Sequence, residues 1–336
     1  MPRWLFRRDR RHLSTGDVTG RVAAVTGGNG FLGSAIVAAL SAAGWRIRLL
    51  ARGALDHPVL SGIALQQVSG DLADAAAVAE LVRDADLVVH AAGLVKARTR
   101  QHFLAVNRDG TARLAEAVKR LPRPPRFILI SSQAAREPSL SDYAASKRLG
   151  EAAAEAVLAG RPCMVLRPCV IYGPWDREGR ALLRLAGSRI APAVRAPEPR
   201  IAMIHVRDAA AAVAAAASGG PEVGVFEICD ERADGYGWRE LLRRLGEANG
   251  RVPRAVAVPD LLIRAAGSAN ELLALAGGPP AMFGAGKARE ILHRDWSADP
   301  ARRLSAALWQ PRIALTEGLA ETVAWARSRR GVPRSR

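Results

Sequence analysis

A glycine-rich stretch, TGGNGFLG, occupies residues 26–33. It follows an apolar run at 22–27 that is typical of a buried strand, and it opens an Ala/Leu-rich run at 31–44 that ends in glycine, as helices do. Gly27, Gly30 and Gly33 have the spacing G-x-x-G-x-x-G. Glycines at such a turn let the backbone approach a pyrophosphate, which the free N–H groups of the helix N-terminus bind. We therefore expect a dinucleotide site at this turn.

The same alternation of strand and helix continues through the first half of the chain. Strands are expected at 22–27, 46–52, 64–71, 86–93, 126–132 and 162–168, and helices at 31–44, 75–84, 106–120 and 143–158. Alternation of this kind predicts the α/β class, with a doubly wound parallel sheet of the Rossmann type covered by helices on both faces.

The alternation of strands and helices becomes less regular after residue 174. Residues 203–217 read as a strand and then a helix, 225–230 as a strand, and the chain from 238 onward as mostly helical with a break at GGPP, 277–280. We expect four regions: a basic N-terminal tail at 1–20, an NADP-binding Rossmann domain at 21–174, a mixed segment at 175–330, and a basic tail at 331–336. The mixed segment would complete the sheet and form a smaller, mainly helical substrate-binding part.

The chain carries a formal net charge of +17. This charge favours anionic partners, such as a phosphorylated cofactor or acidic lipid headgroups. Nucleic acid is not expected as a partner, because aromatic residues make up only 5% of the chain and do not interleave with the basic ones.

Two features bear on localisation. The three cysteines form no CxxC pair, and the N-terminal stretch at 1–16 lacks the apolar core of a signal peptide, so we expect a reduced, cytoplasmic protein. Trp4, Leu5 and Phe6 stand among arginines, which is typical either of contact with an anionic membrane or of a frayed basic tail. Peripheral attachment to the inner face of the plasma membrane therefore stays open.

The end of the second expected strand bears on the choice of cofactor. NAD enzymes place an acidic residue there to bind the ribose 2′-hydroxyl, whereas this chain has Ala51 and Arg52. An arginine suits a 2′-phosphate, and Arg48 could assist it. NADP(H) is therefore favoured, with NAD(H) as the alternative.

Tyr143 and Lys147 lie four residues apart at the start of an expected helix, downstream of Ser131 and Ser132. The chain has only three tyrosines and four lysines. One interpretation is a core helix whose lysine extends to solvent. The other is a catalytic group in which the lysine, one helical turn away, lowers the pKa of the tyrosine.

Several motifs occur in order along the chain. They are the glycine-rich turn, GDL at 70–72, HAAG at 90–93, VNRDGT at 106–111, ISS at 130–132, YAASK at 143–147 and RPCVIYGP at 167–174. Together they resemble the extended short-chain dehydrogenase/reductase (NAD-dependent epimerase/dehydratase) family over residues 21–208.

The resemblance implies roles for individual residues. Tyr143 would be the general acid/base, Lys147 would hold the nicotinamide ribose and lower the pKa of Tyr143, and Ser132 would bind the substrate carbonyl, with Ser131 as the alternative. With the turn and Arg52, the expected cofactor-binding residues are Gly27, Asn29, Gly30, Phe31, Leu32, Gly33, Arg52, Asp71, Leu72, Ala91, Ala92, Gly93, Asn107, Tyr143, Lys147 and Pro168. No metal is assigned, because the spacing of His90, His205 and His293 is not that of metal ligands.

Departures from the family pattern bear on the substrate. Nucleotide-sugar members usually carry VYG after the strand-end serine and asparagine before YGP, whereas this chain has QAAR at 133–136 and Val170-Ile171. Only ten residues separate Ser132 from Tyr143. RPCVIYGP resembles the branch of 3β-hydroxysteroid dehydrogenases and dihydroflavonol reductases, which implies an apolar ketone or alcohol as substrate.

Two apolar segments, 258–267 and 270–284, are either a lid over such a substrate, resting on a membrane, or ordinary core helices. A 3-oxo-sphingolipid or ceramide, a sterol-like ketone and a β-keto acyl chain all fit.

Three functions follow from these observations. The favoured one is an NAD(P)H-dependent short-chain reductase that acts on a lipid-like ketone by Tyr-assisted hydride transfer. The second is a nucleotide-sugar epimerase or dehydratase that retains NAD. The third is a non-catalytic NADP-binding subunit of a membrane complex. A homodimer is compatible with all three.

Overall fold

The computed structural model describes residues 20–328 except for 196 and 277–282. The basic segment around Trp4 to Phe6, the tail at 331–336 and the GGPP break lie outside the described residues. Within the described part of the chain, no helix is both long and apolar enough to cross a membrane.

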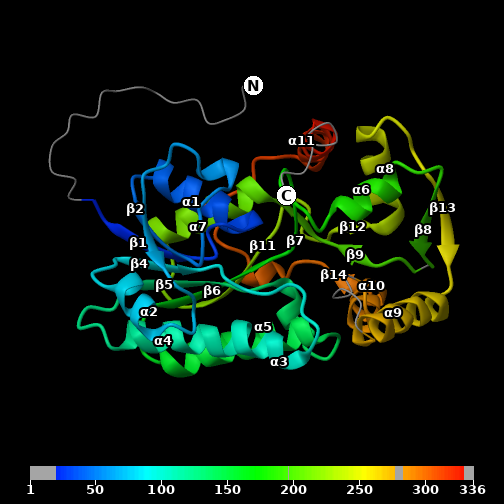
Figure 1. Cartoon of the computed structure of the whole chain (residues 1–336). Helices are drawn as coiled ribbons and strands as arrows, with labels where there is room; N and C mark the ends of the chain where they lie inside the picture. Colours follow the sequence, from blue (N-terminus) through cyan, green and yellow to red (C-terminus); the bar gives the residue numbers. More distant parts are fainter. Residues whose placement is uncertain (1–19, 196, 277–282, 329–336) are drawn as a thin grey trace.

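Seven parallel strands form the main sheet (Figure 1). Their order is β11-β6-β5-β4-β1-β2-β3, so the direction of winding reverses between β1 and β4, where ligands of doubly wound sheets bind. The strands are β1 (Val22–Thr26), β2 (Arg46–Ala51), β3 (Leu65–Ser69), β4 (Leu87–His90), β5 (Arg126–Ile130), β6 (Cys163–Pro168) and β11 (Gly224–Ile228). The predicted Rossmann fold is confirmed.

Helices cover both faces of this sheet, as Figure 1 shows. On one face, α1 (Phe31–Ala42) packs against α7 (Val206–Ser218), and on the other lie α2 (Ala75–Val82), α4 (Thr111–Lys119) and α5 (Asp142–Val157). The central strands β1, β4 and β5 are largely apolar and buried because both of their sides are covered.

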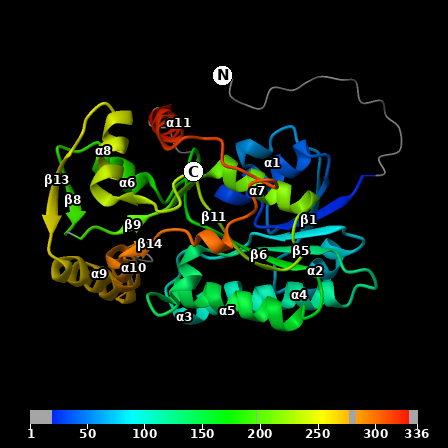
Figure 2. The same cartoon turned by 180° about the vertical axis from the view of Figure 1, so that it is seen from behind.

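A second, smaller part lies to one side of the sheet (Figures 1 and 2). Its short strands form three small sheets, in which β7 pairs with β10, β8 with β13, and β9 with β12 and β14. The strands are β7 (Val170–Tyr172), β8 (Ile190–Val194), β9 (Arg200–Ile201), β10 (Met203–His205), β12 (Tyr236–Gly237), β13 (Arg254–Val258) and β14 (Asp295–Trp296). The helices are α6 (Arg180–Ala186), α8 (Trp238–Ala248), α9 (Asp260–Leu275), α10 (Ala285–Leu292) and α11 (Leu315–Ser328).

Most predicted boundaries differ from the observed ones by one or two residues, and two elements differ by more. The strand predicted to reach residue 93 ends at His90, because the chain beyond it leaves the sheet and enters the loop that faces the glycine-rich turn. The helix predicted at 106–120 begins earlier, as α3 (Arg100–Leu104), and passes through a π-helical turn, η2 (Ala105–Gly110), before α4. Such turns are rare and occur at functional sites.

A buried ion pair fastens α5 to the sheet. The carboxylate of Glu151 accepts two hydrogen bonds from Arg167 of β6, at 2.8 and 2.6 Å. It accepts a third, at 2.5 Å, from the hydroxyl of Ser131, which follows β5. Glu151 and Arg167 are 2% and 5% exposed, so neither charge has water as an alternative partner.

We predict that Glu151→Ala lowers the free energy of unfolding by about 3–5 kcal/mol, because it leaves the Arg167 guanidinium buried without a partner. Urea denaturation measures this change. The control is Glu155→Ala, one turn further along α5, where the side chain is exposed. Equal stability of the two variants would contradict the assigned role of the pair.

Candidate active site

The glycine-rich turn between β1 and α1 is held against the loop that follows β4. Gly27 has φ +73°, and a Cβ built there would lie 2.5–2.7 Å from backbone atoms of Ala91 and Ala92. A Cβ on Gly33 would lie 2.0 Å from the carbonyl oxygen of Gly27. Only glycine fits either position, and the first N–H groups of α1 have no partner within the helix. The turn therefore has the form of a cradle for a diphosphate.

The other predicted cofactor residues lie around the same edge of the sheet. Asp71 follows β3 and accepts a hydrogen bond from the N–H of Ala73 at 2.8 Å, while Leu72 packs close to Gly110. Pro168 ends β6. Asn29 is exposed within the turn, and Phe31 and Leu32 begin α1 half-buried. The structure thus gathers residues from successive parallel strands at one edge, as the sequence predicted.

Arg52 and Arg48 have different positions. Arg52 follows β2 and is exposed, which leaves it available to a 2′-phosphate. Arg48 is buried, and its guanidinium binds the carbonyl oxygens of Glu80 and Leu81 at 3.2 Å, at the end of α2. The expectation that Arg48 assists the cofactor is wrong, because this side chain caps a helix.

Lys147 and Asn107 meet beside Gly93. The Lys147 ammonium donates to the carbonyl of Ile130 at 3.0 Å. The Asn107 amide accepts from the N–H of Leu94 at 2.7 Å and donates to its carbonyl at 3.0 Å, which holds the loop after β4 in place. A Cβ on Gly93 would lie 3.1 Å from both side chains. Burial lowers the pKa of Lys147 to about 8, and the charge of Glu151 opposes that shift.

Tyr143 lies on the same face of α5, one turn before Lys147. Burial raises its pKa to about 12; a hydrogen bond with Ser132 acts in the opposite direction, and the negative charge of Glu290 adds to the rise. The direction is opposite to the lowering by Lys147 that the resemblance implied. The reason is that burial of the phenol is the largest contribution to this shift.

The structure separates the two candidate serines. Ser131 is 6% exposed and its hydroxyl is bound to Glu151 within the buried ion pair. Ser132 is the serine that reaches Tyr143. Its hydroxyl also accepts a hydrogen bond from the N–H of Ala134 at 3.2 Å, at the start of the short turn η3 (Gln133–Arg136).

The QAAR segment forms this turn and joins the two parts of the molecule. Gln133 donates to the carbonyls of Trp296 and Ser297 at 3.1 and 2.8 Å, and Arg136 donates to those of Ser297 and Asp295 at 2.9 and 2.7 Å. Four hydrogen bonds to backbone carbonyls therefore fix the residues after Ser132 to the second part.

His90 is a structural residue beneath the site. It is fully buried, and its ring nitrogens bind the hydroxyls of Thr26 and Thr111 at 2.6 and 2.9 Å. Burial, together with the charge of Lys147, lowers its pKa to about 3, so the ring is neutral at ordinary pH. Among the described residues, no group of three or more His, Cys, Asp or Glu side chains could hold a metal ion.

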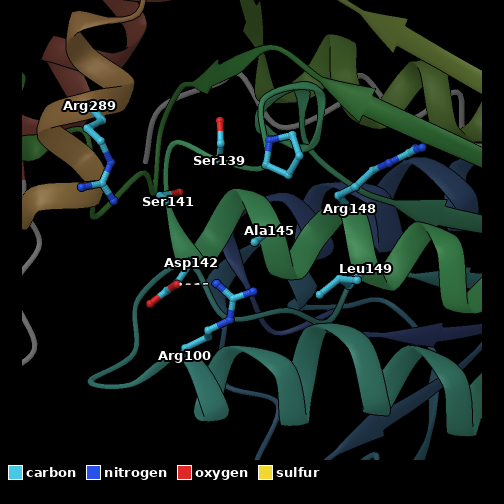
Figure 3. Close-up of a pocket in the computed structure, with 9 residues that line it drawn as sticks. Arg100, Ser139, Ser141, Asp142, Ala145, Arg148, Leu149 and Arg289 are labelled. Carbon is cyan, nitrogen blue, oxygen red and sulfur yellow. Dashed lines mark hydrogen bonds and ion pairs between the residues drawn. The ribbon is translucent and has the colours of Figure 1, made fainter.

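Sequence reasoning missed Glu290 of α10. Glu290 is 7% exposed, and its carboxylate accepts a short hydrogen bond from Ser141, the N-cap of α5, two residues before Tyr143. Figure 3 shows Arg289 of α10 facing Ser139 and Ser141 at this end of α5. No signal in the sequence pairs Ser141 with Glu290, because they lie 149 positions apart.

A parallel sheet of this order, a glycine cradle at its switch point and a Ser/Tyr/Lys group at its edge define a dinucleotide-dependent oxidoreductase. The sequence profile of the NAD dependent epimerase/dehydratase family matches residues 23–229. The chain belongs to this family and is an NAD(P)-dependent oxidoreductase, so the resemblance seen in the motifs is confirmed.

Curated relatives extend the comparison. The ceramide reductase of Caulobacter vibrioides is 41% identical over 315 residues, which are 94% of this chain and 97% of that protein. Sterol demethylase protein B of Methylococcus capsulatus is 31% identical over 190 residues, 49% of this chain and 57% of that protein. The solved structure of MoeE5 in complex with UDP-glucuronic acid and NAD has a TM-score of 0.70 at 22% identity, with 92% of this chain and all of that chain covered. This last likeness shows the fold.

We predict that Glu290→Gln shifts the pH dependence of turnover. The charge of Glu290 raises the pKa of Tyr143, so its removal lowers that pKa. A tyrosine that donates a proton loses activity as pH rises through its pKa, and the alkaline limb of kcat/KM for reduction should move to lower pH.

The amide of the variant still accepts the Ser141 hydrogen bond, so the start of α5 is kept. Glu247→Gln on α8, where the carboxylate is exposed and paired with Arg243, serves as the matched control and should leave the profile in place. An unmoved or alkaline-shifted profile in Glu290→Gln would argue against the coupling.

Proposed function

We propose that the protein reduces a ketone on an apolar, lipid-like substrate, with NADPH as the hydride donor. The observation that carries the proposal is the group of Ser132, Tyr143 and Lys147 at the carboxyl edge of the sheet, in a chain 41% identical along nearly its whole length to a ceramide reductase.

The side chains have separable tasks in this reaction. The Ser132 hydroxyl orients the substrate carbonyl oxygen, and Tyr143 donates its phenolic proton to that oxygen. Lys147 holds the nicotinamide ribose, and Asn107 keeps the loop at 91–94 in place beside it. When bound, the reduced nicotinamide supplies the hydride that adds to the carbonyl carbon. The C=O π bond is replaced by one C–H and one O–H bond, and the product is an alcohol.

The apolar character of the substrate has two further supports. The elements usual in nucleotide-sugar members, VYG and the asparagine before YGP, are absent, and QAAR binds the second part of the protein instead. The name of the Caulobacter relative favours a 3-oxo-ceramide over a sterol-like or β-keto acyl compound. We also propose that the protein works at a membrane surface, where such a substrate resides.

We predict that the purified protein consumes NADPH in the presence of a 3-oxo-ceramide, and that Tyr143→Phe lowers turnover by at least about a hundredfold, because the phenol supplies the proton. NADPH binding, measured by fluorescence titration, should survive. A nucleotide-sugar epimerase would instead show no net NADPH loss and stabilisation by UDP-sugars. A non-catalytic subunit would show no turnover with any of these substrates.

The preference for NADP(H) is proposed from Arg52, which is exposed at the end of β2 where no acidic side chain stands. We predict that Arg52→Glu raises the KM for NADPH by about tenfold or more and leaves or improves that for NADH, because a charge-assisted hydrogen bond to the 2′-phosphate is lost. Arg120→Glu, at the end of α4, is the control for the change in net charge. If Arg52→Glu left the KM ratio unchanged, the assignment would fail.

A further inference from the structure

Helix α9 exposes an apolar face to solvent. Its four leucines Leu261, Leu262, Leu272 and Leu273 are 74, 57, 67 and 67% exposed. At 100° per residue these leucines fall within about half of the helix circumference, together with the exposed residues Ala265, Ala266, Ser268 and Ala269. The charged residues Asp260, Arg264 and Glu271 lie outside that sector. We call these eight residues the leucine face.

The opposite side of α9 packs on α10. A Cβ on Gly267 would lie 2.9 Å from the Cβ of Ala288, so the two helices are in close contact there. Figures 1 and 2 show α9 at the periphery of the molecule, with α10 beside it. The leucine face is therefore turned away from the protein, the reverse of an ordinary surface helix.

Arginines lie to the side of this face, where α9 meets α10. Arg264 and Arg289 are exposed and, with Arg294, line a cleft between α9, α10 and Leu140. Arg289 also borders the neighbouring cleft of Figure 3, together with Arg100 and Arg148. Arg294, Arg100 and Arg148 are paired with carboxylates at 3.2–3.4 Å, whereas Arg264 and Arg289 have no such partner among the described residues. An apolar helix face with arginines beside it that are not paired with carboxylates is typical of helices that lie in the headgroup region of an anionic bilayer.

Helix α10 lies between α9 and the catalytic group. Helix α10 carries Glu290, which binds Ser141 at the start of α5 and acts electrostatically on Tyr143. A surface bound at α9 therefore lies one helix away from the end of α5 that bears the catalytic tyrosine.

We propose that the leucine face of α9 docks on an anionic lipid bilayer, with Arg264 and Arg289 on the headgroups, and presents the Tyr143 end of the active site to the membrane. The proposal rests on the proposed function in that a lipid-like substrate would be drawn from that bilayer.

The test is flotation of the full chain with vesicles, without substrate or NADPH. Vesicles of phosphatidylcholine alone are compared with vesicles that contain phosphatidylglycerol in addition. We expect binding to the anionic vesicles, and a fall of about tenfold in the partition coefficient for each of Leu261→Ser and Leu272→Ser. The double variant Arg264→Gln/Arg289→Gln should lose the preference for anionic vesicles. The matched control is Ile190→Ser/Val223→Ser, which removes apolar side chains 60 and 61% exposed elsewhere.

Thermal unfolding and NADPH titration show that each variant is folded. Vesicle binding that is absent in the wild type, or unaffected by the leucine substitutions, would overturn the proposal. So would dimerisation in solution that Leu261→Ser abolishes, because the face would then be covered by a second copy. A protein that reduces the ketone without binding vesicles refutes the docking alone, whereas one that binds vesicles without turnover refutes the proposed function alone.

Discussion

The buried pair of Glu151 and Arg167 is the interaction on which the catalytic geometry depends. It ties the middle of α5 to β6, and through Ser131 to the end of β5. Ser132 follows Ser131 directly, and Tyr143 and Lys147 lie on the same helix as Glu151. One carboxylate thus sets the distance between the serine on a strand end and the tyrosine on a helix. A desolvated ion pair is suited to this task because its energy falls steeply with displacement.

Different kinds of contact form the glycine-rich edge of the sheet, where the dinucleotide is expected, and the substrate side around Tyr143. At the edge, backbone packs on backbone: Gly27 against Ala91 and Ala92, and Gly33 against Gly27. On the substrate side, groups remote in the sequence reach the residues around Tyr143: the Glu290 side chain of α10 binds Ser141, and the main-chain carbonyl of Trp296 in β14 accepts a hydrogen bond from Gln133. The solved structure compared above shares the fold at 22% identity, and a shared fold does not by itself determine the substrate.

The sequence was sufficient for the Rossmann sheet and for the residues at its edge, since these depend on local patterns: apolar strand runs, a glycine turn, and a tyrosine and lysine one helical turn apart. It failed where a residue's partner is remote. Arg48 looked like a phosphate ligand but caps α2, and Glu290 had no signal at all. The pKa of Tyr143 could not be predicted either, because burial, which dominates it, is a property of the whole fold.

The hydrogen bonds of Gln133 and Arg136, which fix the QAAR turn to the second part of the protein, bear on how freely that second part can change in sequence. The hydrogen bonds of both side chains to residues 295–297 go to the carbonyl oxygens of Asp295, Trp296 and Ser297. Main-chain acceptors are present whatever the residue type. These hydrogen bonds can therefore form whatever side chains stand at 295–297. The junction is a suitable point at which to graft the substrate-binding part of one reductase onto the cofactor-binding part of another.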